Sequence, residues 1–379
     1  MNSVKRKNKY LRGVRAWFGI CPVAHCTSLV ALVLIVLHLA TRHNHALMVH
    51  LSENVVRPIH AFLARLCAHT DISVAEVIIV AFIALILGRL IYGLVRLLRR
   101  KSSVICAYKL LMWLVAAVCL VYAGYSLLWG VYYYGDDFIS KSGLESQPIS
   151  TEQLETVTEY FAALANECGR EVVRDENGFY RGDREAILRR SVSLFDDTVD
   201  EFPCLDGPRV AAKGIKLSRA LSYIDFTGFL FPFTAEANVN TDFPPAQFAS
   251  TVAHELSHQR GVAKEQEANF VAVLASMRTD DADYRYSAAL LAYTHLGNAL
   301  HSADYDAWES VYSSLDENVR RDFALNNAYW RQFDTPMQSV SNTVYEGFLQ
   351  SYEQTLGMKS YGACVDLLVN YYYDVAAAQ

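Results

Sequence analysis

Five consecutive residues, His254-Glu255-Leu256-Ser257-His258, have the types and spacing of a metal-dependent hydrolytic site. Residues four apart lie on one face of a helix, so the imidazoles of His254 and His258 can bind a single metal ion. Glu255, one position along, would lean toward a water on that ion and act as a general base. The pattern therefore predicts a Zn²⁺ site in which Glu255 is catalytic and is not a ligand.

The residues before the motif favour a buried helix. Phe248, Val252 and Leu256 recur at a spacing of four, which suits a helix with one apolar face. Histidine and glutamate side chains in such a helix need polar partners or a metal. This favours a metal site over a solvated helix that carries two unrelated histidines.

A catalytic zinc site needs a third protein ligand, which leaves the fourth position for water. Gly261 is predicted to end the first helix, and a second helix is expected over residues 263–276. Glu265 and Glu267 lie about 200° apart on that helix, so both cannot face one ion. Glu265 shares its face with small residues that allow close approach, so we favour it as the ligand, with Glu267 as the alternative. Asn269, one turn after Glu265, is expected to hydrogen-bond a liganding histidine.

The combined pattern, His-Glu-x-x-His followed by Glu-x-x-Ala-Asn, resembles the gluzincin peptidases. In that family a glutamate on the next helix completes the zinc site, and an Asp or Asn one turn later supports it. The matching residues here are His254, Glu255, His258, Glu265, Ala268 and Asn269. The sequence departs from the metzincin pattern, because Lys264 stands where those enzymes have a third histidine.

Most of the chain is also similar to an uncharacterised bacterial family of membrane-anchored, zincin-like proteins. The segments that carry this likeness are Leu128-Trp129-Gly130, residues 226–240, residues 267–270 and Ser360-Tyr361-Gly362. The resemblance implies a membrane location and a zincin-like fold. It implies no substrate, because that family has none established.

Three apolar segments precede the motif region, at residues 21–40, 72–95 and 104–134. Each can cross a bilayer, which needs about 20 residues. Basic residues concentrate before the first segment and after the second, so positive-inside reasoning places both in the cytoplasm. We therefore expect a basic cytoplasmic tail at 1–20, a transmembrane region at 21–134 and an extracytoplasmic domain at 135–379.

Charge divides the chain at the same place. There are 15 Lys and Arg against 3 Asp and Glu up to Gly135, and 19 against 37 after it. An acidic exterior domain is not expected to bind nucleic acid. The partners that we expect are the lipid bilayer and a peptide or protein substrate in the cell envelope.

The exterior domain is predicted to be mainly α-helical, as an α-rich (α+β) zincin-like metallopeptidase domain. Helices are expected at residues 150–190, 184–202, 282–300, 304–323, 344–356 and 361–373. One short strand is expected at 235–239. Residues 235–238 are a candidate for the cleft edge along which an extended peptide binds, and the alternative is that these residues form a plain loop. Cys168, Cys204 and Cys364 allow at most one disulfide, and Cys168 with Cys204 is the pair considered.

The leading functional hypothesis is a membrane-anchored zinc metallopeptidase. A further donor should stabilise the oxyanion, and both Tyr361 and His295 are candidates. The alternative is a non-catalytic envelope protein whose metal site is structural or vestigial, closed by a fourth protein ligand. An intramembrane protease is disfavoured, because charged and polar residues surround the motif.

Overall fold

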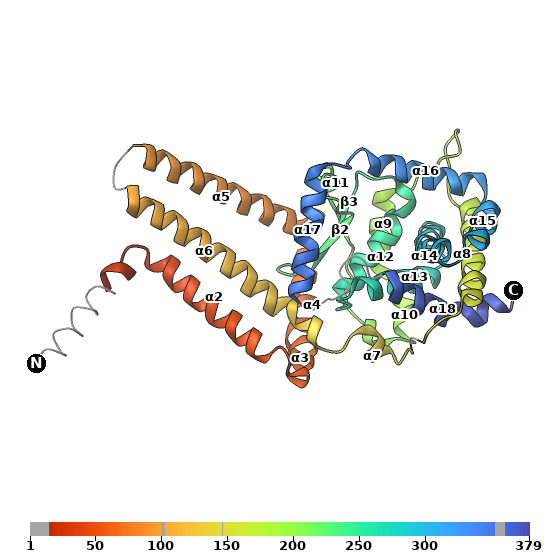
Figure 1. The fold of residues 1–379 in the computed structure, drawn as a ribbon, viewed down its shortest axis with the longest axis horizontal. Coiled ribbons are helices and arrows are strands. Elements are labelled where there is room, and N and C mark those ends of the chain that lie inside the picture. The colour runs from red at the N-terminus through yellow and green to blue at the C-terminus, as the bar shows by residue number, and fades with distance from the viewer. Residues whose placement is uncertain (1–14, 100–102, 146, 353–360) are drawn as a thin grey trace, which may run out of the picture.

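Three long helices project from a helical domain (Figure 1). This computed structural model describes residues 15–99, 103–145, 147–352 and 361–379. The three helices are α2 (Pro22–Thr41), α5 (Val74–Leu98) and α6 (Ser103–Leu128), and each is long and apolar enough to cross a membrane. The three predicted apolar segments are thus confirmed as helices. Most of the predicted cytoplasmic tail, residues 1–14, lies outside the described residues, as do the basic residues at 100–102.

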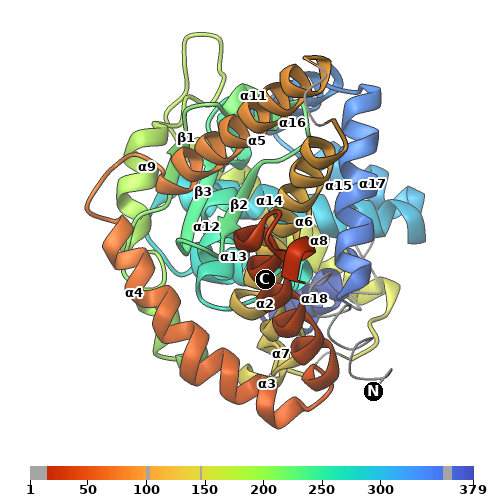
Figure 2. The same cartoon turned by 90° about the vertical axis from the view of Figure 1, so that its left-hand side faces the viewer.

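The third apolar segment ends earlier than the sequence predicted. Helix α6 stops at Leu128, and the chain continues as the 3₁₀ helix η2 (Gly130–Tyr134). Between the first two long helices, α3 (His45–Leu51), the π-helical turn η1 (Ser52–Val56) and α4 (Arg57–Cys67) run along the rim of the domain face from which these helices project (Figure 2). Several elements N-terminal to Gly135 therefore pack against the domain.

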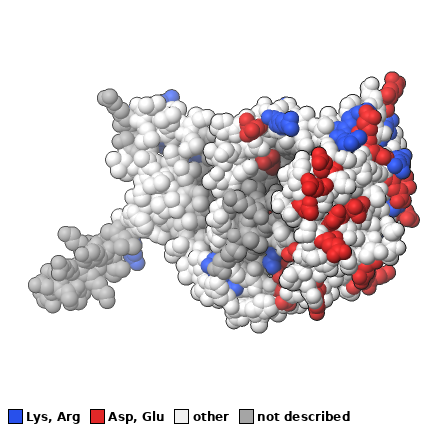
Figure 3. All heavy atoms as spheres, turned by 45° about the vertical axis from the view of Figure 1, so that its right-hand side comes forward, with Lys and Arg blue, Asp and Glu red and all other residues white. Residues whose placement is uncertain are grey.

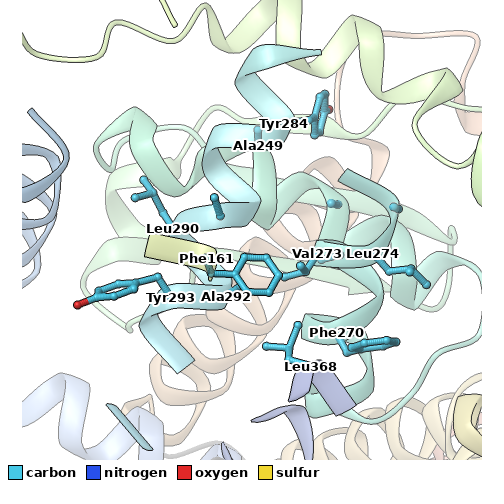
Figure 4. Close-up of a cluster of buried hydrophobic side chains, with 14 of the residues drawn as sticks. Phe161, Ala249, Phe270, Val273, Leu274, Tyr284, Leu290, Ala292, Tyr293 and Leu368 are labelled. Atoms are coloured by element: carbon cyan, nitrogen blue, oxygen red, sulfur yellow. The ribbon is translucent and has the colours of Figure 1, made fainter. Parts of the chain in front are cut away.

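The domain is built mainly from helices. Its core lies between α8 (Thr151–Glu171), α12 (Phe248–Gln259), α13 (Glu265–Met277), α14 (Ala282–Ala303) and α18 (Tyr361–Ala377). Side chains from these helices, among them Phe161, Phe270, Leu290 and Leu368, gather in one buried cluster (Figure 4). The other helices are α7 (Phe138–Ser142), α9 (Arg184–Arg190), η3 (Ser191–Ser193), α10 (Asp196–Val199), η4 (Pro203–Leu205), α11 (Ser218–Ser222), η5 (Pro245–Gln247), α15 (Tyr305–Ser314), α16 (Glu317–Arg331) and α17 (Pro336–Ser351).

Three of the predicted helical segments are interrupted. Residues 150–190 form α8 and α9 with a loop between them, residues 184–202 are divided among α9, η3 and α10, and residues 304–323 are divided between α15 and α16. Apolar periodicity alone did not mark these breaks, because tertiary contacts stabilise each short helix. Cys168, Cys204 and Cys364 are free thiols, so the disulfide considered between Cys168 and Cys204 is absent.

The domain contains one small sheet of three strands, in the order β1-β3-β2. Strand β1 (Lys213–Ile215) is parallel to β3 (Glu236–Asn240), and β2 (Gly228–Phe231) is antiparallel to β3. The predicted strand near residues 235–239 is confirmed as β3. The prediction that it forms the edge is wrong, because β3 lies in the middle and β2, which we did not predict, forms the edge.

Charge follows this division into membrane helices and domain. Acidic side chains gather over the domain, whereas the surface of the long helices shows few charged groups (Figure 3). The uncharged surface includes many exposed Leu, Ile and Val side chains on α2, α5 and α6. Such a large exposed apolar surface fits contact with lipid.

A buried ion pair fixes the start of α5 to the sheet. The carboxylate of Glu236 in β3 accepts hydrogen bonds from the backbone N–H groups of Val74 and Ala75, at 3.0 and 2.8 Å. The ammonium of Lys213 in β1 donates to Glu236 at 2.8 Å. Both side chains are buried. A carboxylate at a helix N-terminus also meets the positive end of the helix dipole, so the sheet caps a membrane helix.

Replacing Glu236 by Gln should destabilise the protein by about 3 kcal/mol, because it leaves the charge of Lys213 buried without its partner. The measurement is the unfolding temperature of the detergent-solubilised protein. Glu185→Gln, which removes a pair between two exposed side chains, is the matched control and should change little. An equal effect of both substitutions would contradict this role of Glu236.

Candidate metal centre

The turn between α12 and α13 determines where the candidate metal ligands meet. The N–H of Gly261 donates to the carbonyl of His258 at 2.9 Å, and the N–H of Val262 donates to that of Ser257 at 3.2 Å. This pair of bonds is a Schellman motif, whose left-handed residue is Gly261 with φ of 86°. The turn reverses the chain, and α13 begins at Glu265 beside the end of α12.

Three side chains converge across this turn. The Nε2 atoms of His254 and His258 lie 3.0 Å apart, and Nε2 of His254 lies 3.1 Å from Oε2 of Glu265. The same carboxylate oxygen lies 3.6 Å from Nε2 of His258. The three ligand atoms all lie within 4.8 Å of one another. The structure therefore brings together the three residues that we favoured as metal ligands.

Contacts around this cluster orient its members. The Nδ1–H of His258 donates to the carbonyl of Val262 at 2.7 Å, which leaves Nε2 directed at the cluster. The ring of Trp129 packs edge-on against His258, with centroids 5.8 Å apart. The hydroxyl of Tyr345 in α17 donates to Oε1 of Glu265 at 3.0 Å. Such outer contacts hold metal ligands in their binding orientation.

Glu267, the alternative third ligand, faces away from the cluster. Its Oε2 accepts the backbone N–H of Phe138 at 2.7 Å, and its Oε1 lies 3.4 Å from Nζ of Lys264. Burial raises the pKa of Glu267 to about 7, against the opposing effect of the Lys264 charge. Asn269 lines the cavity beside the cluster, but among the described residues it makes no hydrogen bond to either histidine.

Glu255 lies beside the cluster and contacts strand β2. The backbone N–H of Leu230 lies near its carboxylate and lowers its pKa, and its Oε2 has no hydrogen-bond partner within the described part of the chain. A Cβ at Gly228 would lie 2.5 Å from Oε1 of Glu255, so only glycine lets the strand approach this closely. Burial raises the pKa of Glu255 to about 7, although the nearby histidines lower it.

The cluster is strongly coupled electrostatically. Burial lowers the pKa of His258, but the carboxylate of Glu265 outweighs this effect and raises it to about 9. Burial raises the pKa of Glu265, but the charge of His258 outweighs it and holds that pKa well below its usual range. Each group therefore stabilises the charged form of the other.

A cavity of about 410 Å³ opens beside the three side chains. Its lining includes His254, Glu255, His258 and Glu265, together with residues of β2 and of α17. The end of α6 and the turn after it contribute Tyr125, Trp129 and Tyr133. No local pattern predicted that Tyr345 or Tyr133 belongs to the site, because each reaches it through long-range packing.

His295, one of the two residues suggested as oxyanion donors, is not among the described residues that line the cavity. His295 in α14 is buried, and burial followed by the charge of His254 lowers its pKa to about 4. It is therefore a neutral imidazole that lies close enough to His254 to feel its charge. The side chain of Tyr361 lies outside the described residues.

The donor set fits a zinc ion. Two imidazole nitrogens and one carboxylate oxygen are the ligands of a catalytic zinc site with one position left for water. The Nε2 atoms point at one another, and the carbonyl of Val262 fixes the proton of His258 on Nδ1. The residues present thus suit the ion that the sequence motif implies.

Residues 51–369 match a family model described as "Protein of unknown function (DUF3810)". This match includes His254, Glu255, His258, Glu265 and Tyr345. No curated protein and no solved structure matches the chain.

Gly261→Ala should destabilise the protein by about 1–2 kcal/mol, because a Cβ is strained in the left-handed conformation. The new Cβ would also lie 2.9 Å from the ring of Tyr132. Thermal unfolding measures the effect. Gly362→Ala, where a Cβ meets nothing within 4 Å, is the control and should be neutral or slightly stabilising. Unchanged stability of Gly261→Ala would show that the turn does not need glycine.

Proposed function

We propose that this chain, which belongs to the DUF3810 family of proteins of unknown function, is a membrane-anchored zinc metallopeptidase. The observation that carries the proposal is the position of Glu255. Its carboxylate lies in the same cavity as His254, His258 and Glu265. Zinc-dependent hydrolysis requires a carboxylate that does not bind the metal, placed next to side chains that do. Glu255 and the three candidate ligands have this arrangement.

His254, His258 and Glu265 would hold the ion. Zn²⁺ bound there would supply a Lewis acid that polarises the scissile carbonyl and lowers the pKa of water toward about 7. Glu255 accepts a proton from the attacking water at its free Oε2 and delivers it to the leaving amine. The nearby backbone N–H of Leu230 favours the charged form of this carboxylate. Tyr345 fixes the orientation of Glu265 through its hydroxyl.

The strand arrangement supports a peptide as the substrate. Strand β2 is the sheet edge that lines the cavity, and it is antiparallel to β3. An extended peptide binds to such an edge through backbone hydrogen bonds. A zincin-like domain, with a sheet edge beside the metal-binding helix, is therefore part of this proposal. The proposal also places the domain outside the cytoplasm, on the evidence of the basic residues at 5–15 and 96–101.

A structural or vestigial metal site is the rival interpretation. Structural zinc sites usually have four protein ligands. Within the described residues the group has three members, His254, His258 and Glu265, and the cavity beside them leaves room for water and substrate. This favours an open, catalytic site.

Glu255→Gln should retain zinc and lower peptide cleavage by at least about 100-fold, because the general base is lost. His258→Ala should lose both zinc and cleavage. Metal content by mass spectrometry and cleavage of a peptide library, measured on the purified full-length protein, test both expectations. Full activity of the Glu255→Gln variant would rule out the proposed role of this residue.

Tyr345→Phe should weaken zinc binding by about 10- to 100-fold, because removal of an outer hydrogen bond frees the liganding carboxylate. A competition titration with a zinc chelator measures the affinity. Tyr312→Phe, at a partly exposed tyrosine on α15, is the matched control and should leave affinity unchanged. Equal affinities of the wild type and Tyr345→Phe would show that the contact between Tyr345 and Glu265 does not support the metal.

A further inference from the structure

Strand β2 presents one backbone edge to the cavity. Its pairing with β3 is continued by the bond from the N–H of Asn240 to the carbonyl of Thr227. Hydrogen-bonding directions alternate along a strand, so the polar groups of Gly228 and Leu230 point away from β3. The contact of the Leu230 N–H with Glu255 agrees with this direction. A chain paired with β2 would therefore pass directly beside the catalytic carboxylate.

One end of β2 leads to the membrane helices. The chain turns after β2, where the N–H of Ala235 donates to the carbonyl of Phe231 at 2.7 Å. In this turn the ring of Phe233 packs onto Gly124, where a Cβ would lie only 2.5 Å from the ring. Gly124 lies within the apolar span at Val104–Leu128. The turn after β2 thus lies beside the C-terminal end of α6, the last part of this candidate membrane span.

The wall of the cavity next to this turn also comes from α6. Tyr125 and Trp129 line the cavity from the end of this helix and the residue after it. Tyr and Trp are the residues that favour the boundary between lipid and water. The metal-binding cavity is therefore built, on one side, from the interfacial end of a membrane helix.

The other end of β2 leads away from the membrane helices to a second, polar cavity. Asp225 and Thr227, just before β2, line both the metal-binding cavity and a neighbouring cavity of about 660 Å³ between α14 and α16. Its lining includes Arg320, Arg331 and Trp308. Helix α16 lies on the part of the domain away from the long helices (Figure 1). Guanidinium and aromatic groups suit the backbone and side chains of a soluble peptide segment.

We infer that the substrate is a membrane-spanning protein, cut in the segment that directly follows its span. This rests on the proposed peptidase function. A chain along β2 would have one end at the bilayer and the other in the polar cavity. Leu230, beside Glu255, is three residues from Phe233, which is about 10 Å of extended chain. The cleaved bond would therefore lie about three to five residues outside the lipid.

The reaction is hydrolysis of one peptide bond. Water adds its hydroxyl to the acyl carbon, the C–N bond breaks, and the released amine takes the proton that Glu255 carries. The product on the membrane side stays anchored by its span, and the other product leaves through the polar cavity.

The experiment uses the full-length, zinc-loaded protein in vesicles of phosphatidylethanolamine and phosphatidylglycerol. A single-span reporter with ten randomised residues outside its span is reconstituted with it, and the same randomised peptides without a span are added to a parallel sample. Mass spectrometry maps the cuts. We expect anchored peptides to be cut at least about ten-fold more often, because anchoring raises their effective concentration at the site. The cuts should cluster within about five residues of the span.

A ten-residue Gly-Ser spacer between the span and a cleaved sequence should lower its cleavage about ten-fold, because the sequence no longer lies beside β2 while anchored. Arg331→Ala should raise KM for the anchored reporter, and Arg189→Ala, an exposed arginine on α9, is its control. Equal cleavage of free and anchored peptides, or no effect of the spacer, overturns this inference alone. If the zinc-loaded protein cuts neither library, the proposed peptidase function fails as well.

Discussion

Ionisable groups that are shielded from water need partners, and this requirement determines how the side chains of the candidate metal centre are arranged. His258 and Glu265 lie at the edge of a packed helical core, where each side chain would be costly to charge alone. Together they stabilise opposite charges. The Schellman turn at Gly261, the carbonyl of Val262 and the hydroxyl of Tyr345 all act to keep these groups in contact. A divalent cation would satisfy the same requirement, because it brings positive charge to the carboxylate and lone-pair acceptance to the imidazoles.

Local sequence was sufficient to predict the parts of the site that depend on helix geometry. The spacing of His254 and His258 and the angular separation of Glu265 from Glu267 follow from 3.6 residues per turn. Gly261 could be recognised as a helix end for a similarly local reason. Tyr345 lies 80 residues from Glu265 along the chain, and no local pattern links them. Strand β2 was missed because four residues with half-buried side chains on both faces give no alternating pattern.

The predicted division at residue 134 follows charge and hydropathy, whereas packing joins the two parts. Glu236 in the domain caps the first turn of α5. The chain after α6 continues directly into the site, where Trp129 contacts His258. Mutual fixation of this kind limits the tilt of the long helices relative to the domain. Sequence alone separated the two parts because hydropathy reflects the solvent around a segment and carries no information about contacts between segments.

A second buried charge network lies away from the candidate metal ligands. Away from the cavity, Arg174 pairs with Asp322 at 2.8 Å, and Tyr286 donates to the same carboxylate at 2.5 Å. This network joins the segment that follows α8 to α14 and α16 beside a continuous apolar core. The ligand cluster, by contrast, lies against a cavity, and Oε2 of Glu255 has no partner within the described part of the chain. Unpartnered buried polar atoms lower stability, and proteins retain such costs mainly at functional sites. A binding role, as proposed above, therefore explains the cluster better than a contribution to folding does.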